Sequence, residues 1–96
     1  MHVISKKTLR DFWADYPDAE SPLRSWLKAA RRVDWKNFAE VHGTFPKADR
    51  VGKLTVFNIA GNKYRLIAAI HHNRGKIYIR HVLTHAEYDR GTWKED

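Results

Sequence analysis

The amino-acid sequence predicts an α+β domain in which two to three N-terminal helices pack on a small, mainly antiparallel sheet. In the first half of the chain apolar residues recur at helical spacing, and in the second half three short apolar runs are separated by turn residues. With 96 residues the chain has room for one modest hydrophobic core, so residues 1–96 are expected to form a single domain.

The N-terminal half is predicted to begin with two helices. After a short apolar start, His2–Ile4, that could be an edge strand, Ser5 can cap a first helix, which Pro17 ends. The apolar face of this helix has the spacing i, i+3, i+4, i+7 in Leu9, Phe12, Trp13 and Tyr16. Ser21 followed by Pro22 indicates the start of a second helix, whose apolar residues have the same spacing.

A third, shorter helix is expected from Trp35 to about His42, with Asp34 as its cap and Gly43 at its end. The following residues, 44–53, combine proline, glycine and mixed charge, so they are expected to be a loop.

The second half is predicted to be an antiparallel meander with strands at residues 54–59, 64–71 and 76–83. Gly61-Asn62 is a good two-residue turn, because glycine supplies the positive φ that a type II′ turn needs. This turn pairs Asn58 with Arg65 on one face and leaves the other face apolar. Arg65 then either serves a working face of the sheet or lies on a solvated one.

The second hairpin of the meander leaves two registers open. A two-residue loop places Arg80 on the Arg65 face, and a three-residue loop places His81 there. After the meander, Thr84 can cap one helical turn at residues 85–91, and Trp93 is expected to pack on the core.

The composition narrows the class of protein. A formal net charge of +7 indicates a polyanionic partner such as nucleic acid, and the alternative is a basic protein without such a partner. The absence of cysteine excludes disulfides and thiolate metal sites. No apolar run approaches the ~20 residues of a membrane helix, and the N-terminus lacks the apolar core of a signal peptide. We therefore expect a cytoplasmic protein that does not bind a membrane.

A stripe of four cations lies on the second predicted helix, at the spacing i, i+4, i+7, i+8: Arg24, Lys28, Arg31 and Arg32. No acid lies among them, so the stripe is interpreted as a contact for RNA phosphates. The alternative interpretation is an ordinary solvated helix face.

The sequence does not indicate a metal site or a cofactor, because its histidines and carboxylates lack the spacing of metal ligands and it has no phosphate-binding loop. RNA can be cut without a metal. The ribose 2′-OH is the nucleophile and lies within the substrate, so the protein supplies a base, an acid and cations around the phosphate.

Residues near the end of the meander suit this chemistry. His85 suits acid or base work, since histidine titrates near neutral pH. Tyr88 can donate a proton or stack on a base, and Arg65 has a planar fork that matches phosphate oxygens. Further cations nearby are Lys53, Lys63 and Arg80. Structural alternatives are that Tyr88 packs on the core, that Lys63 is a turn lysine, and that Arg80 pairs with Glu87.

Two blocks make the sequence resemble a known family. VFNIAGNKYRLIAAI (residues 56–70) and KIYIRHVLTHAEYD (residues 76–89) are similar to the HigB family of bacterial toxins, which belongs to the RelE-like mRNA interferases. The resemblance extends over nearly the whole chain and implies a RelE-like fold. It also implies a toxin that cleaves messenger RNA, typically on the translating ribosome, and a HigA-like antitoxin with a helix-turn-helix domain.

The resemblance also implies roles for single residues. Arg65 lies where these toxins carry a phosphate-binding arginine, and His85 and Tyr88 lie where they place acid/base and base-stacking residues. The strand before Arg65 departs from several RelE-like toxins because it has no lysine; Lys53 precedes it and Lys63 follows it. The general base therefore stays open.

Taken together, the sequence and the resemblance predict a metal-independent endoribonuclease that cleaves messenger RNA on the translating ribosome, with Arg65, His85, Tyr88 and Lys63 as catalytic candidates. The first alternative is a non-catalytic basic RNA-binding module, which gives His85 no task. The second is a regulator whose basic face binds an acidic antitoxin.

Overall fold

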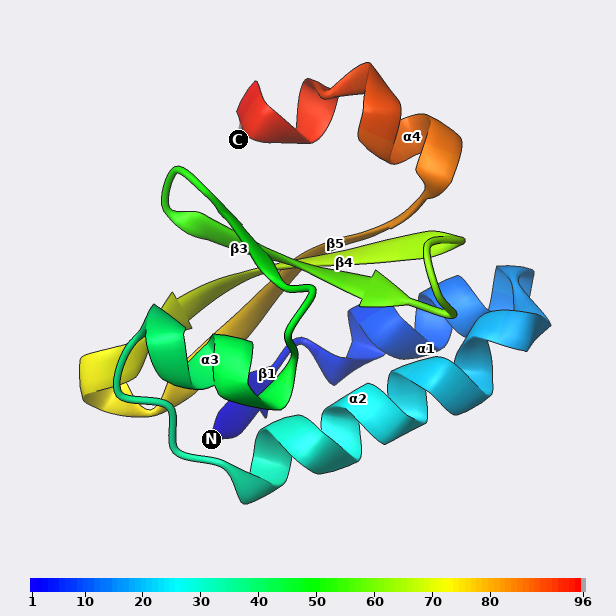
Figure 1. Cartoon of the computed structure of the whole chain (residues 1–96). Coiled ribbons are helices and arrows are strands. Elements are labelled where there is room, and N and C mark those ends of the chain that lie inside the picture. Colours follow the sequence, from blue (N-terminus) through cyan, green and yellow to red (C-terminus); the bar gives the residue numbers. More distant parts are fainter. Residues whose placement is uncertain (96) are drawn as a thin grey trace.

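The computed structural model describes residues 1–95, and these form an α+β domain with helices on both faces of a five-stranded mixed sheet (Figure 1). The strands are β1 (His2–Ile4), β2 (Asp49–Val51), β3 (Leu54–Ile59), β4 (Tyr64–His71) and β5 (Lys76–Thr84), in the order β1-β5-β4-β3-β2. β1 runs parallel to β5, and every other neighbouring pair is antiparallel. The predicted fold class is confirmed.

The first hairpin has the predicted register. Asn58 pairs with Arg65, and Gly61 has a φ of +69°. The Lys63 N–H donates to the Ala60 carbonyl oxygen at 3.3 Å, which closes the turn. Ala60 also has a positive φ, +55°, which the sequence did not predict because alanine rarely adopts it.

The second hairpin contains an irregularity that decides the open register. Ile67 pairs with His81, whereas the next residue of β4, Ala68, pairs with Ile79. Arg80 is therefore the extra residue of a β-bulge, and His81 lies on the Arg65 face. Neither of the two registers predicted from loop length describes the whole hairpin, because the pairing shifts at the bulge and loop length does not predict a bulge.

On one face of the sheet lie α1 (Lys6–Asp15), the 3₁₀ turn η1 (Pro17–Ala19), α2 (Glu20–Arg32) and α3 (Phe38–Thr44) (Figure 1). Ser5 precedes α1 in a left-handed conformation and makes no side-chain cap. α2 begins at Glu20, before the predicted cap Ser21, because η1 runs directly into it. Pro22 is tolerated there, since the first turn of a helix has no use for its missing N–H.

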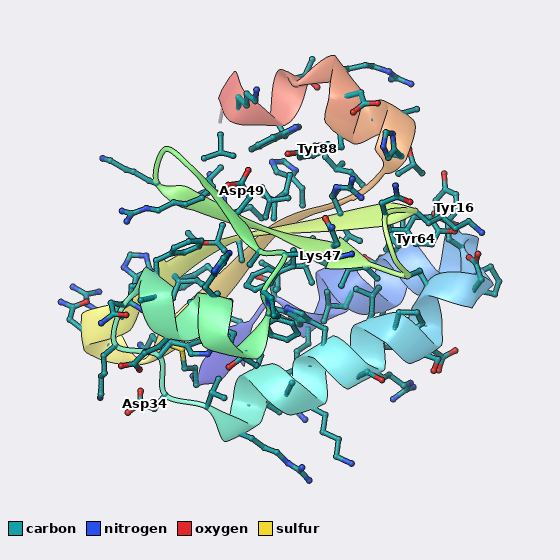
Figure 2. The ribbon with its side chains drawn as sticks, in the orientation of Figure 1. Tyr16, Asp34, Lys47, Asp49, Tyr64 and Tyr88 are labelled. Atoms are coloured by element: carbon teal, nitrogen blue, oxygen red, sulfur yellow. The ribbon has the colours of Figure 1, made fainter. Side chains whose placement is uncertain are left out.

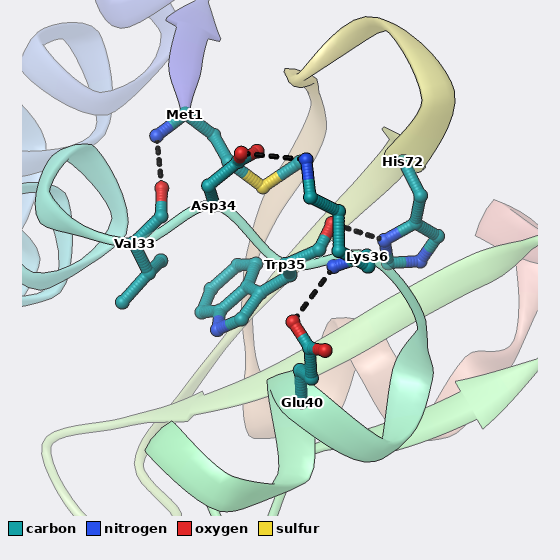
Figure 3. Close-up of polar contacts among 7 residues, drawn as sticks. All are labelled: Met1, Val33, Asp34, Trp35, Lys36, Glu40 and His72. Carbon is teal, nitrogen blue, oxygen red and sulfur yellow. Dashed lines mark hydrogen bonds and ion pairs between the residues drawn. The ribbon is translucent and has the colours of Figure 1, made fainter.

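The predictions for the α2–α3 connection were partly wrong. The cap of α3 is Asn37, whose side-chain oxygen accepts from the Glu40 N–H at 3.1 Å, whereas Asp34 pairs with Lys36 at 2.7 Å (Figure 3). Residues 44–53 are not wholly a loop, because they contain β2. β2 has three residues and is stabilised by pairing with β3, so hydrophobic patterning could not reveal it.

The hairpin between β4 and β5 contacts this connection. The 3₁₀ turn η2 (His72–Arg74) lies in that hairpin, and the His72 imidazole Nδ1 donates to the Trp35 carbonyl oxygen at 2.9 Å (Figure 3). Trp35 itself is buried, and its indole Nε1 donates to Thr44 Oγ1 at 3.0 Å. The α2–α3 connection is thereby held against the far end of the sheet.

Each face of the sheet carries a hydrophobic core. The larger core packs Phe57 and Leu66 against buried residues of α1 and α2, as the predicted apolar face requires. The smaller core consists of Val56, Ile67 and Trp93, and it is covered by α4 (His85–Arg90) and the 3₁₀ turn η3 (Thr92–Glu95). The predicted packing of Trp93 is confirmed, since its exposed fraction is 3%. Of the helices in residues 1–95, none combines the length and apolar character that a membrane span requires.

Candidate active site

The candidate site lies on the sheet face that α4 covers, opposite α1 and α2 (Figure 1). The guanidinium carbon of Arg65 on β4 lies 5.1 Å from the centre of the Tyr88 ring on α4. The Tyr88 ring in turn stacks on Trp93, with ring centres 5.2 Å apart and planes 14° apart. Figure 2 shows Tyr88 between α4 and the sheet. Strand, helix and C-terminal turn are thus joined by one stack of side chains.

Arg65 is oriented by the backbone of the hairpin that precedes it. Its Nη1 donates to the carbonyl oxygens of Asn62 at 2.7 Å and of Tyr64 at 3.2 Å. The guanidinium is half-buried and has further N–H groups in a fixed plane. Held on one edge by carbonyls and on one face by Tyr88, it can present its remaining donors to an anion without reorganisation.

His85 is the first residue of α4 and is held by its backbone and its side chain. Its N–H donates to the Lys63 carbonyl oxygen at 3.1 Å, and its Nδ1 lies 2.9 Å from Asp89 Oδ2. A proton on Nδ1 that is donated to Asp89 leaves Nε2 as the nitrogen that accepts or delivers a proton. Sequence reasoning missed Asp89, although its i, i+4 spacing from His85 was a usable signal.

The start of α4 is set by the predicted cap. Thr84 Oγ1 accepts from the Glu87 N–H at 3.2 Å, and Glu87 Oε1 accepts from the Thr84 N–H at 2.9 Å. This reciprocal cap is worth about 1 kcal/mol and determines where His85 and Tyr88 enter the helix. Glu87 forms this cap in the structure, instead of the ion pair with Arg80 that the sequence offered as an alternative.

Lys63 is directed to the other side of the hairpin. Its ammonium pairs with the carboxylate of Asp18 in η1, which also accepts from the Tyr64 hydroxyl at 2.6 Å. Hydrogen bonds from Lys63 and Tyr64 lower the pKa of Asp18, and the hydrogen bond to Asp18 raises the pKa of Lys63. In this position the pairing with Asp18 favours the cationic form of Lys63, which does not suit a general base. The structure therefore does not bring its ammonium to Arg65.

A basic pocket of about 640 Å³ lies on the same face of the sheet as Arg65, beside Trp93. It brings together the predicted Lys53 and Arg80 and adds cations that sequence reasoning had not placed in the site, Arg50 and Lys94. No carboxylate is among the described residues that line it. Its lining includes Ala69, which lies about 13 Å from Arg65 along β4, and Trp93, on which Tyr88 stacks.

α2, the helix that carries the basic stripe, lies on the sheet face opposite α4, which contacts Arg65 (Figure 1). The members of the stripe, Arg24, Lys28, Arg31 and Arg32, are exposed, as expected. The stripe is less purely basic than it looked, because Arg24 pairs with Glu20 at 2.7 Å and lies 4.7 Å from the centre of the Trp13 ring. The fold therefore separates this stripe from the basic pocket.

Metal-ligating residues do not gather in the described part of the chain: among residues 1–95 there is no group of three or more histidine and carboxylate side chains that could hold an ion.

Comparison with known proteins agrees with this fold. A family model described as HigB_toxin, the RelE-like toxic component of a toxin–antitoxin system, matches residues 19–91. The mRNA interferase toxin HigB of Escherichia coli (strain K12) is 34% identical over 92 residues, which cover 93% of this chain and 88% of the relative. The mRNA interferase HigB of Escherichia coli O6:H1 (strain CFT073) is 30% identical over 95 residues, which cover 96% and 92%.

The molecule is thus of the RelE-like toxin class, with helices on a small mixed sheet and a helix-covered arginine on its central strand. Within that class, the chain belongs to the HigB toxin family.

Proposed function

We propose that this protein is an mRNA interferase, an endoribonuclease that cleaves messenger RNA and thereby inhibits translation. The observation that carries the proposal is Arg65, held by two backbone carbonyls and stacked on Tyr88, on a sheet face that continues into a basic pocket. Support also comes from relatives that are named mRNA interferases.

The proposed reaction is a transesterification within the RNA. The ribose 2′-oxygen bonds to the adjacent phosphorus, its proton leaves to a base, and the bond to the 5′-oxygen of the next nucleotide breaks with protonation of that oxygen. The products are a 2′,3′-cyclic phosphate and a 5′-hydroxyl, and no metal is required.

Each candidate residue has a task in this reaction. Arg65 stabilises the charge that develops on the phosphate, and its preorganised donors suit that task. His85 transfers a proton through Nε2, with Asp89 holding its orientation. Tyr88, whose ring is packed against Arg65 and Trp93, orients a base near Arg65 through its hydroxyl. Lys63, which is ion-paired with Asp18, acts by holding the hairpin that carries Arg65.

The cations of the basic pocket, with Lys53 and Arg80 among them, bind phosphates that flank the cleaved bond. α2 lies on the sheet face opposite α4, and its stripe is exposed, so the stripe binds a second RNA segment, which in a translating complex is ribosomal RNA. The proposed partner that restrains the toxin is a HigA-like antitoxin with a helix-turn-helix domain, and the proposed compartment is the cytoplasm.

The test is to express the toxin from a tightly controlled promoter and to map new 5′ ends on messenger RNA. Cuts within translated regions are expected for the wild type and not for Arg65→Ala or His85→Ala. Lys7→Ala is the matched control, since Lys7 is an exposed cation on α1. Adding a chelator to the lysate tests metal independence, and isolated RNA tests whether the ribosome is needed.

Two outcomes contradict the proposal. One is undiminished cleavage by a folded Arg65→Ala protein. The other is RNA binding by the folded wild type without any new 5′ end, which would support the non-catalytic binding module instead.

A further inference from the structure

Asp18 links the helical layer to the end of the sheet that carries the site. It lies in η1, between α1 and α2, yet its carboxylate accepts from the Tyr64 hydroxyl and pairs with the Lys63 ammonium. Tyr64 has an exposed fraction of 3%, so its hydroxyl needs a partner inside the protein. Asp18 provides that partner as a charge-assisted acceptor at 2.6 Å.

Aromatic packing also holds Tyr64 in place. The Tyr64 ring lies 5.2 Å from Phe12, edge to face, and 5.7 Å from Tyr16. Figure 2 shows Tyr16 and Tyr64 close together at this end of the molecule. The start of β4 is therefore held by ring contacts and by the bonds to Asp18.

The residues that Asp18 holds are also the ones that orient the candidate site. Three successive backbone carbonyls at this end of the hairpin bind groups of the candidate site. Those of Asn62 and Tyr64 accept from Arg65, and that of Lys63 accepts from the His85 N–H. Asp18 binds the side chains of two of these three residues. A shift of this short segment would move the guanidinium and the start of α4 together.

We propose that Asp18 is a positioning residue for Arg65 and His85. By holding Lys63 and Tyr64, it sets the direction of the three carbonyls and hence the place of both groups, without contact with RNA. The segment needs such support, because it follows a turn with positive φ at both Ala60 and Gly61. The effect on rate rests on the proposed nuclease function, whereas the effect on geometry does not.

The experiment compares Asp18→Ala, Asp18→Asn and Tyr64→Phe with the wild type. The single-turnover cleavage rate is measured with the toxin in saturating excess over RNA, and KM is measured separately at steady state. Each variant is checked for folding by its Tm. Roughly tenfold slower cleavage is expected for Asp18→Ala and for Tyr64→Phe, because small misplacements of reacting groups are costly. KM is expected to stay within about twofold, since neither residue touches RNA in the proposal.

Two comparisons separate positioning from general stability. The Asp18→Ala Tyr64→Phe double variant is expected to cleave about as slowly as Asp18→Ala, because both changes break one link. Asp18→Asn keeps an oxygen for the Tyr64 hydroxyl, so it is expected to retain more activity and serves if Asp18→Ala folds poorly. Asp11→Ala is the matched control, as Asp11 is another exposed, ion-paired carboxylate.

A second readout does not depend on activity. The His85 amide donates to the Lys63 carbonyl, so its hydrogen exchange reports how firmly the hairpin holds α4. Exchange at this amide is expected to accelerate in Asp18→Ala and not in Asp11→Ala.

The proposal is overturned if folded Asp18→Ala cleaves at the wild-type rate with unchanged exchange at His85. It is also overturned if the variant changes KM alone, because Asp18 would then act on RNA binding through Lys63. If the wild type does not cut RNA, the proposed function fails, and the exchange measurement still decides whether Asp18 positions the site.

Discussion

The guanidinium carbon of Arg65 lies 5.1 Å from the centre of the Tyr88 ring. A residue of the central strand thus contacts a residue of the C-terminal helix α4. This contact brings together two residues that sequence reasoning had selected for separate reasons. Because the Tyr88 ring also stacks on Trp93 and packs against the smaller core, the contact belongs to the packing of the domain, as the structural alternative for Tyr88 expected.

Arg65→Ala is expected to lower the cleavage rate by roughly 10²-fold or more, because it removes preorganised donors from the developing charge. Arg65→Lys is expected to recover a small part of the rate, since an ammonium is a point charge that cannot reproduce the planar fork. Single-turnover cleavage of one RNA by both variants measures the difference. An Arg65→Lys rate equal to that of the wild type would show that the planar geometry of the guanidinium is unimportant.

His85→Ala is expected to slow cleavage by roughly 10²- to 10⁴-fold, the usual range for a positioned proton-transfer group. It should also change the shape of the pH–rate profile, because a proton-transfer group is removed. Asp89→Asn is expected to slow cleavage less, since the imidazole remains but loses its charged partner. A pH–rate profile that keeps its shape in His85→Ala would assign proton transfer to another group.

The Asp18 link is expected to make stability depend on pH at both extremes. The pKa of Asp18 is lowered by its hydrogen bonds from Lys63 and Tyr64, so its contribution is present above about pH 4 and is lost as pH falls further. The pKa values of Lys63 and Tyr64 are raised by their hydrogen bonds to Asp18, so their contribution is present below about pH 10 and is lost as pH rises further.

The measurement for this link is the free energy of unfolding of the wild type and of Asp18→Asn across pH. The wild type is expected to be the more stable protein between about pH 4 and pH 10, with the difference shrinking outside that window. A difference that is constant across pH would mean that Asp18 contributes without its charge.

Trp93→Ala is expected to destabilise the domain by about 3–5 kcal/mol, because it empties the smaller core and removes the ring on which Tyr88 stacks. Urea unfolding gives the change directly. Trp93→Phe should cost less, since it keeps part of the ring surface. A loss below about 1 kcal/mol would mean that α4 is held mainly by its cap and backbone contacts.

Lys53→Ala and Arg80→Ala are each expected to weaken binding of a short RNA and to lower the salt slope of log K by about 1. Arg31→Ala is the matched control, because Arg31 belongs to the stripe on α2, which lies on the sheet face opposite α4. Binding of a non-cleavable RNA at several salt concentrations measures these slopes. An equal effect of Arg31→Ala would show that a short RNA does not distinguish the two surfaces.

Local patterns were sufficient for much of the fold. The Gly61-Asn62 turn determined the β3–β4 register, because a hairpin with a defined turn and an apolar face allows one pairing. Alternation along β4 then assigned Leu66 to the larger core and Arg65 to the other face. The Thr84 cap was likewise predictable, since its partner Glu87 lies within one helical turn.

The sequence by itself therefore determined the α+β class, the central hairpin and the residue types that suit cleavage of RNA. Tertiary structure alone decided where those residues lie: the bulge at Arg80, the separation of the α2 stripe from the pocket, and the pairing of Lys63 with Asp18. The physical reason is the distance along the chain over which each kind of interaction acts. Turns, caps and alternation act between neighbours in the chain, whereas Asp18 meets Lys63 and Tyr64 across dozens of residues, through packing that no local pattern encodes.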